Sequence, residues 1–126
     1  MVVFSNHRIG PGAELLVSPE VAAELLREVA AAAGPSATGR WEHELVTWLD
    51  RVATSNATGF DVSDIAWTPE HFERQRGFLI AAIKGAMESS RNARALGRWL
   101  SMIEAHPRES VQVGRRWQWP PKELTI

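Results

Sequence analysis

The feature that most constrains this chain is a helix-start signal that occurs twice. Residues 18–20 read Ser-Pro-Glu and residues 68–70 read Thr-Pro-Glu. The hydroxyl side chain can accept a free backbone N–H bond, proline already has a helical φ, and glutamate is favoured at the positive end of the helix dipole. Apolar residues at helical spacing follow both signals. We therefore predict one helix that ends at Gly34 and Pro35, and a longer one that runs to about Met87.

Apolar stripes predict two further amphipathic helices, one after the loop at residues 36–39 and one that stops near His106 and Pro107. Residues 77–83, in the middle of the long third helix, are apolar all round, which predicts a central helix surrounded by the others. The stripes consist of Trp41, Leu45, Trp48, Leu49 and Val52 in the second helix, and of Leu96, Trp99, Leu100 and Ile103 in the fourth.

The two ends of the chain have the patterns of strands. Short apolar clusters at residues 2–4 and 15–17 flank a Gly-Pro-Gly turn, and they predict either two short strands or an irregular arm. Apolar and polar residues alternate over residues 111–119, which predicts a strand. Because a lone strand is unstable, we expect it to pair with an amino-terminal strand. The connector before the third helix is expected to plug the core with Phe60, Ile65 and Trp67.

These elements predict a mainly α fold of the α+β class, with a four-helix core and a small β-sheet formed by the N- and C-terminal segments. The 126 residues suffice for a single domain over residues 1–126, in which residues 1–17 and 108–120 are short strands or extended arms. A hydrophobic content of 44% and a charged content of 23% are typical of folded proteins, so we expect the chain to fold unaided.

Several missing features narrow the class of protein. The chain has no cysteine, which excludes disulfides, thiolate metal sites and a thiol nucleophile. Its start does not resemble a signal peptide, and its longest uncharged apolar stretch, residues 77–83, is far shorter than the roughly 20 residues that span a bilayer. We therefore expect a cytoplasmic protein that has no membrane partner. The strong preference for arginine over lysine suggests a GC-rich, bacterial genome.

The local motifs of familiar enzymes and metal sites do not occur in the sequence. His43 and Glu44 begin the zinc pattern H-E-x-x-H, but Thr47 occupies the position of the second histidine. Residues 10–12 lack the third glycine of a dinucleotide-binding loop, and no phosphate-binding loop or nucleophile elbow is present. We therefore predict no cofactor and no metal. An enzyme with a site near His43 and His71 is a third hypothesis, which requires these side chains to approach each other across the second and third helices.

Charge is divided unevenly along the chain. Residues 1–83 carry six basic and eleven acidic side chains, net −5, whereas residues 84–126 carry eight basic and four acidic side chains, net +4. Arg91, Arg94 and Arg98 follow at helical spacing opposite the apolar stripe of the fourth helix. The first two lie near the helix start, where the dipole disfavours cations. Helix stability therefore does not explain this arginine row.

Two explanations of the arginine row remain open. The row can pair with acidic residues of the first helix, Glu20, Glu24 or Glu28, in the same molecule or in a neighbour. It can instead bind phosphates, with Arg115 and Arg116 of the predicted terminal strand extending the patch.

Trp117 and Trp119 project from one face of the predicted terminal strand. They either close the core or remain partly exposed as a binding hot spot, and we favour closure of the core.

The leading hypothesis is a non-enzymatic protein-interaction or regulatory module that engages an acidic protein surface or associates with itself as a homodimer. The alternative is a nucleic-acid-associated regulator that uses the same arginines. The candidate partner-binding residues are Arg91, Arg94, Arg98, Arg115, Arg116, Trp117 and Trp119.

Overall fold

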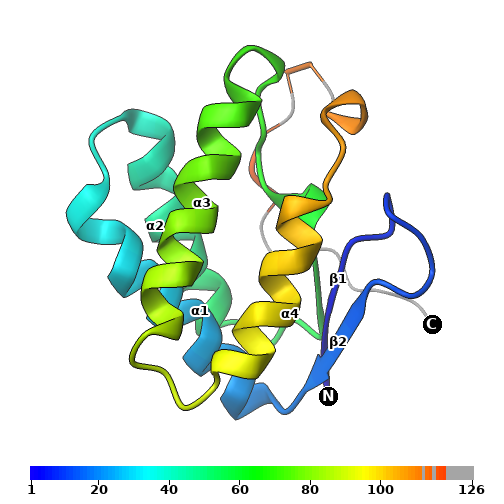
Figure 1. Cartoon of the computed structure of the whole chain (residues 1–126), viewed down its shortest axis with the longest axis vertical. Helices are drawn as coiled ribbons and strands as arrows, with labels where there is room; N and C mark the ends of the chain where they lie inside the picture. The colour runs from blue at the N-terminus through cyan, green and yellow to red at the C-terminus, as the bar shows by residue number, and fades with distance from the viewer. Residues whose placement is uncertain (112, 115, 119–126) are drawn as a thin grey trace.

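The computed structural model of the chain describes residues 1–111, 113–114 and 116–118. Over these residues the fold is α+β, with four α-helices and one three-stranded sheet (Figure 1). The elements are β1 (Val2–Ser5), β2 (Glu14–Val17), α1 (Pro19–Ala33), α2 (Arg40–Ala53), β3 (Gly59–Asp61), α3 (Phe72–Met87) and α4 (Ala93–Glu104).

The first helix-start signal acts as predicted. The Ser18 hydroxyl accepts the backbone N–H of Val21 at 3.2 Å, and α1 ends just before Gly34. The second signal acts differently, because its proline begins a short 3-10 turn and the Thr68 side chain does not cap α3. The buried Gln75 side chain instead accepts the Thr68 backbone N–H at 2.9 Å and donates to the Thr68 hydroxyl at 2.8 Å. Helix α3 therefore begins at Phe72.

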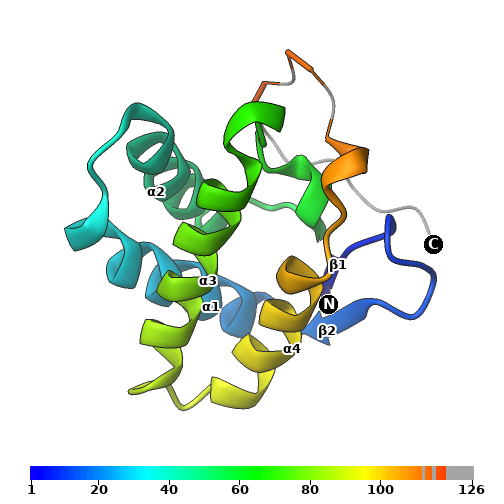
Figure 2. The same cartoon turned by 45° about the horizontal axis from the view of Figure 1, so that its top comes forward.

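The apolar run at residues 77–83 predicted that the other helices surround α3. In the structure they do not, because one side of α3 faces solvent. Helix α1 packs against α2 and α3, and α4 packs against the other side of α3 (Figures 1 and 2). The outer side of α3 exposes Gly77 and Ala81, and it leaves Phe78 and Ile80 half-buried. Small apolar residues expose little area, so they can face solvent at low cost. An uninterrupted apolar run therefore did not require burial on every side.

The predicted sheet between the two chain ends is wrong in its third strand. Strand β1 lies in the middle, antiparallel to β2 and parallel to β3, which comes from the predicted connector. The described part of residues 108–118 contains no strand and begins with a 3-10 turn at Arg108–Ser110. Parallel pairing places Phe60 beside Phe4, with ring centroids 5.5 Å apart, so β3 contributes an aromatic core residue directly.

The core joins the sheet to all four helices. At its centre, the Phe4 and Phe60 rings each contact Trp99 of α4 edge-on, at centroid distances of 5.2 and 5.6 Å. Phe60, Ile65 and Trp67 are all buried, which confirms the prediction that this segment plugs the core. In the described residues, no helix combines the length and apolar character needed to cross a membrane.

Candidate functional site

The three members of the arginine row are exposed, but their surroundings differ. Arg91 precedes α4 and forms an ion pair with Glu24 of α1. Glu24 also accepts a 2.8 Å hydrogen bond from Asn92. The bond from Arg91, and after it the bond from Asn92, lowers the pKa of the Glu24 carboxyl below its usual value. The expected pairing with the acidic first helix therefore occurs at Arg91, within the same molecule.

Arg94 and Arg98 lie on the outer side of α4. Arg98 donates from Nη2 to the backbone carbonyl of Glu14 at 2.9 Å, which ties α4 to the start of β2. Arg94 makes no hydrogen bond or ion pair with any described residue. Two exposed cations therefore remain on this surface.

A surface hollow of about 350 Å³ adjoins Arg98, between α4 and the loop before β2. Its lining is largely apolar and includes Met102, Ala105 and Ala13. Ile9, another lining residue, is 43% exposed and adds apolar area to the hollow. We call Arg94, Arg98 and this hollow the α4 face.

Of the four predicted carboxy-terminal site residues, Arg116 and Trp117 are described. Arg115 and Trp119 lie outside the described residues. Arg116 is exposed, and the half-buried Trp117 packs against α2. The row itself contacts α1 and β2, through Arg91 and Arg98, so no described contact joins Trp117 to it.

Trp117 is held on α2 by rings and by hydrogen bonds. Its ring centroid lies 5.7 Å from that of Trp41 and 5.3 Å from that of Trp48. Its indole N–H donates to Oε2 of Glu44 at 2.9 Å, and the Trp48 indole N–H donates to the Gln118 backbone carbonyl at 2.9 Å. The bond from Trp117 is the main cause that lowers the pKa of Glu44, followed by a bond from Arg40.

The two histidines of the enzyme hypothesis are both exposed and line separate hollows. His43 lines a hollow over α2, and His71 lines another at the start of α3. The side chains do not converge on a common site. Among the described residues, no group of three or more histidines or acidic residues could hold a metal ion.

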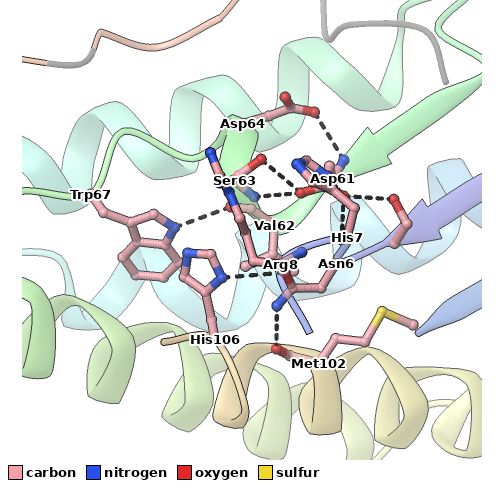
Figure 3. Close-up of polar contacts among 11 residues, drawn as sticks. Asn6, His7, Arg8, Asp61, Val62, Ser63, Asp64, Trp67, Met102 and His106 are labelled. Carbon is pink, nitrogen blue, oxygen red and sulfur yellow. Dashed lines mark hydrogen bonds and ion pairs between the residues drawn. The ribbon is translucent and has the colours of Figure 1, made fainter. Parts of the chain in front are cut away.

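A buried polar cluster around Asp61 escaped the sequence analysis (Figure 3). The Asp61 side chain is almost fully buried and accepts hydrogen bonds from the Ser5 hydroxyl at 2.8 Å and the Ser63 hydroxyl at 2.7 Å. It also accepts the backbone N–H groups of His7 and Ser63, and its own N–H donates to Asp64. Burial by itself raises the pKa of Asp61, but the bonds from Ser63 and His7 outweigh it, so the pKa lies below its usual value.

Chemically, the Asp61 cluster can orient an imidazole. His7 Nδ1 lies 2.7 Å from Asp61 Oδ2, and the His7 side chain is 59% exposed. A carboxylate in this position fixes the ring orientation, as it does in catalytic triads. Both nearby serine hydroxyls, however, donate to the carboxylate, and neither is bonded to the imidazole. The cluster therefore joins β1 to β3, with both hydroxyls directed at the carboxylate.

A second set of buried contacts connects Asn6, which directly follows β1, to the end of α4 (Figure 3). Asn6 is fully buried and donates to the Met102 backbone carbonyl at 2.9 Å. Its Oδ1 lies 3.3 Å from Nδ1 of the buried His106, whose ring lies against Trp67. The partners of His7 and His106 in these contacts are distant in sequence. No local spacing signals such contacts.

Comparison with known proteins adds no relative: neither a family model, nor a curated protein, nor a solved structure matches this chain.

Proposed function

We propose that this chain is a non-enzymatic protein-interaction module whose α4 face binds an acidic, partly apolar segment of another protein. The observation that carries the proposal is Arg94, which is exposed and has no partner among the described residues. It lies one turn from Arg98, which borders the hollow. A cation near an apolar hollow suits a ligand that combines carboxylates with an aliphatic side chain.

The same surface suits duplex DNA less well. Binding to duplex DNA neutralises several phosphates at once. Arg91 is already paired with Glu24, so the described α4 face offers Arg94 and Arg98. Arg116, which would extend a phosphate-binding surface, is adjacent to the Trp117 that packs on α2. We therefore favour the acidic protein segment as the partner.

The direct test is fluorescence anisotropy with three probes: a labelled peptide that alternates glutamate and leucine, the same peptide with serine for leucine, and a short DNA duplex. We expect the glutamate–leucine peptide to bind most tightly. Arg94→Glu should weaken that binding about tenfold, because it removes one attraction and adds one repulsion. Arg94 makes no hydrogen bond or ion pair with a described residue, so we expect this change to leave the fold intact.

The matched control is Lys84→Glu, which makes the same change of charge on the exposed side of α3. It should leave the peptide affinity unchanged. An equal loss in both variants would show that only net charge matters and would overturn the proposal. So would a failure of the glutamate–leucine peptide to bind at low salt. Preferential binding of DNA, with log affinity falling by roughly 0.9 per phosphate against log salt, would favour the nucleic-acid alternative.

A further inference from the structure

Residues 116–118 lie on α2 in the manner of a bound peptide. The Trp117 ring packs against both Trp41 and Trp48, and it is half-buried there. Two indole hydrogen bonds hold the segment on α2. Trp117 of the segment donates to Glu44, and the Gln118 carbonyl of the segment accepts from Trp48. The α2 surface thus recognises a tryptophan side chain together with the main chain of the next residue. Paired side-chain and main-chain contacts of this kind are typical of peptide recognition.

The receiving surface is held in place by contacts that do not involve Trp117. The Trp41 indole donates to the Ala66 carbonyl at 2.7 Å. The Trp48 ring is buried against Phe60, with centroids 5.2 Å apart. Arg40 donates to the second carboxylate oxygen of Glu44 at 2.9 Å. The platform is therefore preorganised, which lowers the free-energy cost of accepting a ligand. We call Trp41, Glu44 and Trp48 the α2 platform.

The described residues between Val111 and Trp117 are exposed, whereas Val111 itself packs against the core. Arg108 and Glu109 are exposed, and Val113 is 86% exposed. Gly114 has φ +74°, a left-handed conformation that favours glycine and lets the chain turn sharply. Among the described residues after Val111, Trp117 and Gln118 make the contacts with α2. A connection of this kind permits the end to bind to its own α2 or to another.

We propose that the α2 platform is a docking site for a tryptophan-bearing extended segment, and that the segment around Trp117 of a second copy of this chain fills it in trans. Every copy carries both the platform and the segment, so exchange between two copies preserves each contact and changes only the connection. The segment of the same chain competes for the platform with an effective concentration on the order of millimolar. Exchange between copies therefore becomes dominant when this intramolecular contact is blocked or when the protein concentration is high. The α2 platform shares no residue with the α4 face. The proposal for the platform therefore does not depend on whether the α4 face binds a partner.

The decisive experiment mixes two variants of the 126-residue chain. Trp117→Ala has an intact platform but no indole to fill it, whereas Glu44→Lys has an intact segment but a platform whose acceptor is lost. We expect each variant alone to be monomeric by light scattering. Their equimolar mixture should form a heterodimer, because each supplies what the other lacks. Replacing Glu44→Lys in the mixture by the double variant Glu44→Lys/Trp117→Ala, which has no indole to offer, should abolish the association.

A peptide probe tests the platform independently of dimerisation. We expect a synthetic peptide with the sequence of residues 113–121 to bind the Trp117→Ala chain, and to bind the unsubstituted chain at least about tenfold more weakly because the cis segment competes. The same peptide with Trp117→Ala, which retains Trp119, should not bind. Failure of the parent peptide to bind a folded Trp117→Ala chain would overturn the docking site. Peptide binding without heterodimer formation would overturn the second copy as the occupant.

Discussion

The exposed imidazole of His7 is held by the buried carboxylate of Asp61, with Nδ1 and Oδ2 only 2.7 Å apart across 54 positions of sequence. The same carboxylate accepts bonds from Ser5 in β1 and from Ser63, just after β3. Asp61 thereby links the parallel pair of β1 and β3 to His7 in the loop that follows β1. A buried charge with this many donors makes the local fold sensitive to its removal.

Asp61→Asn should lower the free energy of unfolding by about 2–4 kcal/mol. In the parent protein several donors bond the carboxylate, whereas in the variant some of them would face the N–H₂ group of the amide, which is itself a donor. Urea denaturation at neutral pH measures this loss. The control is Asp50→Asn on the exposed side of α2, which should change stability by less than about 0.5 kcal/mol. Equal effects of the two substitutions would contradict a special role for Asp61.

The stability of the protein should fall on acidification, and Asp61 should account for part of the fall. Its pKa is lowered in the folded state, so the unfolded state binds more protons in the interval between the two pKa values. The contribution is therefore fully present above the unfolded value of about 3.9 and is lost as the pH falls through the folded pKa. Urea midpoints measured over a series of acidic pH values should show a shallower decline for Asp61→Asn than for the parent. Parallel declines would refute the assignment.

Asn6→Ala should loosen the end of α4. The substitution leaves the Met102 carbonyl without its buried donor and removes the polar neighbour of His106. We expect a loss of about 1–3 kcal/mol in the free energy of unfolding. Hydrogen exchange should accelerate most in the last turn of α4. Asn56→Ala, in an exposed loop, is the matched control, and uniform acceleration throughout the chain would argue against a local effect.

Gln75→Leu should destabilise the start of α3 more than Thr68→Val does. Gln75 is buried and satisfies the Thr68 backbone N–H, which the leucine would leave unpaired. Thr68→Val keeps that backbone bond and removes only the hydroxyl contact. Thermal unfolding of both variants measures the difference. The reverse order would mean that the threonine side chain, and not the glutamine, organises this turn.

Local patterns predicted the helices because the forces that start and end a helix act over a few residues. Ser18 caps α1 as expected, and the stripe from Trp41 to Val52 packs the inner side of α2. At Thr68 the local signal was overridden, because a buried glutamine seven positions away replaced the predicted cap. Contrary to the prediction from their apolar pattern, residues 77–83 are not buried on every side, because such a pattern indicates which residues can be buried and not which neighbours cover them.

The sequence by itself determined where helices form, which faces are apolar and which side chains carry charge, since spacing and side-chain chemistry set these locally. Only the tertiary structure decided that β3 pairs with β1, that Asn6 meets Met102 across 96 positions, and that Trp117 rests on α2. Such pairings depend on chain segments that closure of the whole core brings together. Their residues carry no mark of one another in the sequence, because the energy of each contact exists only once the intervening chain has folded.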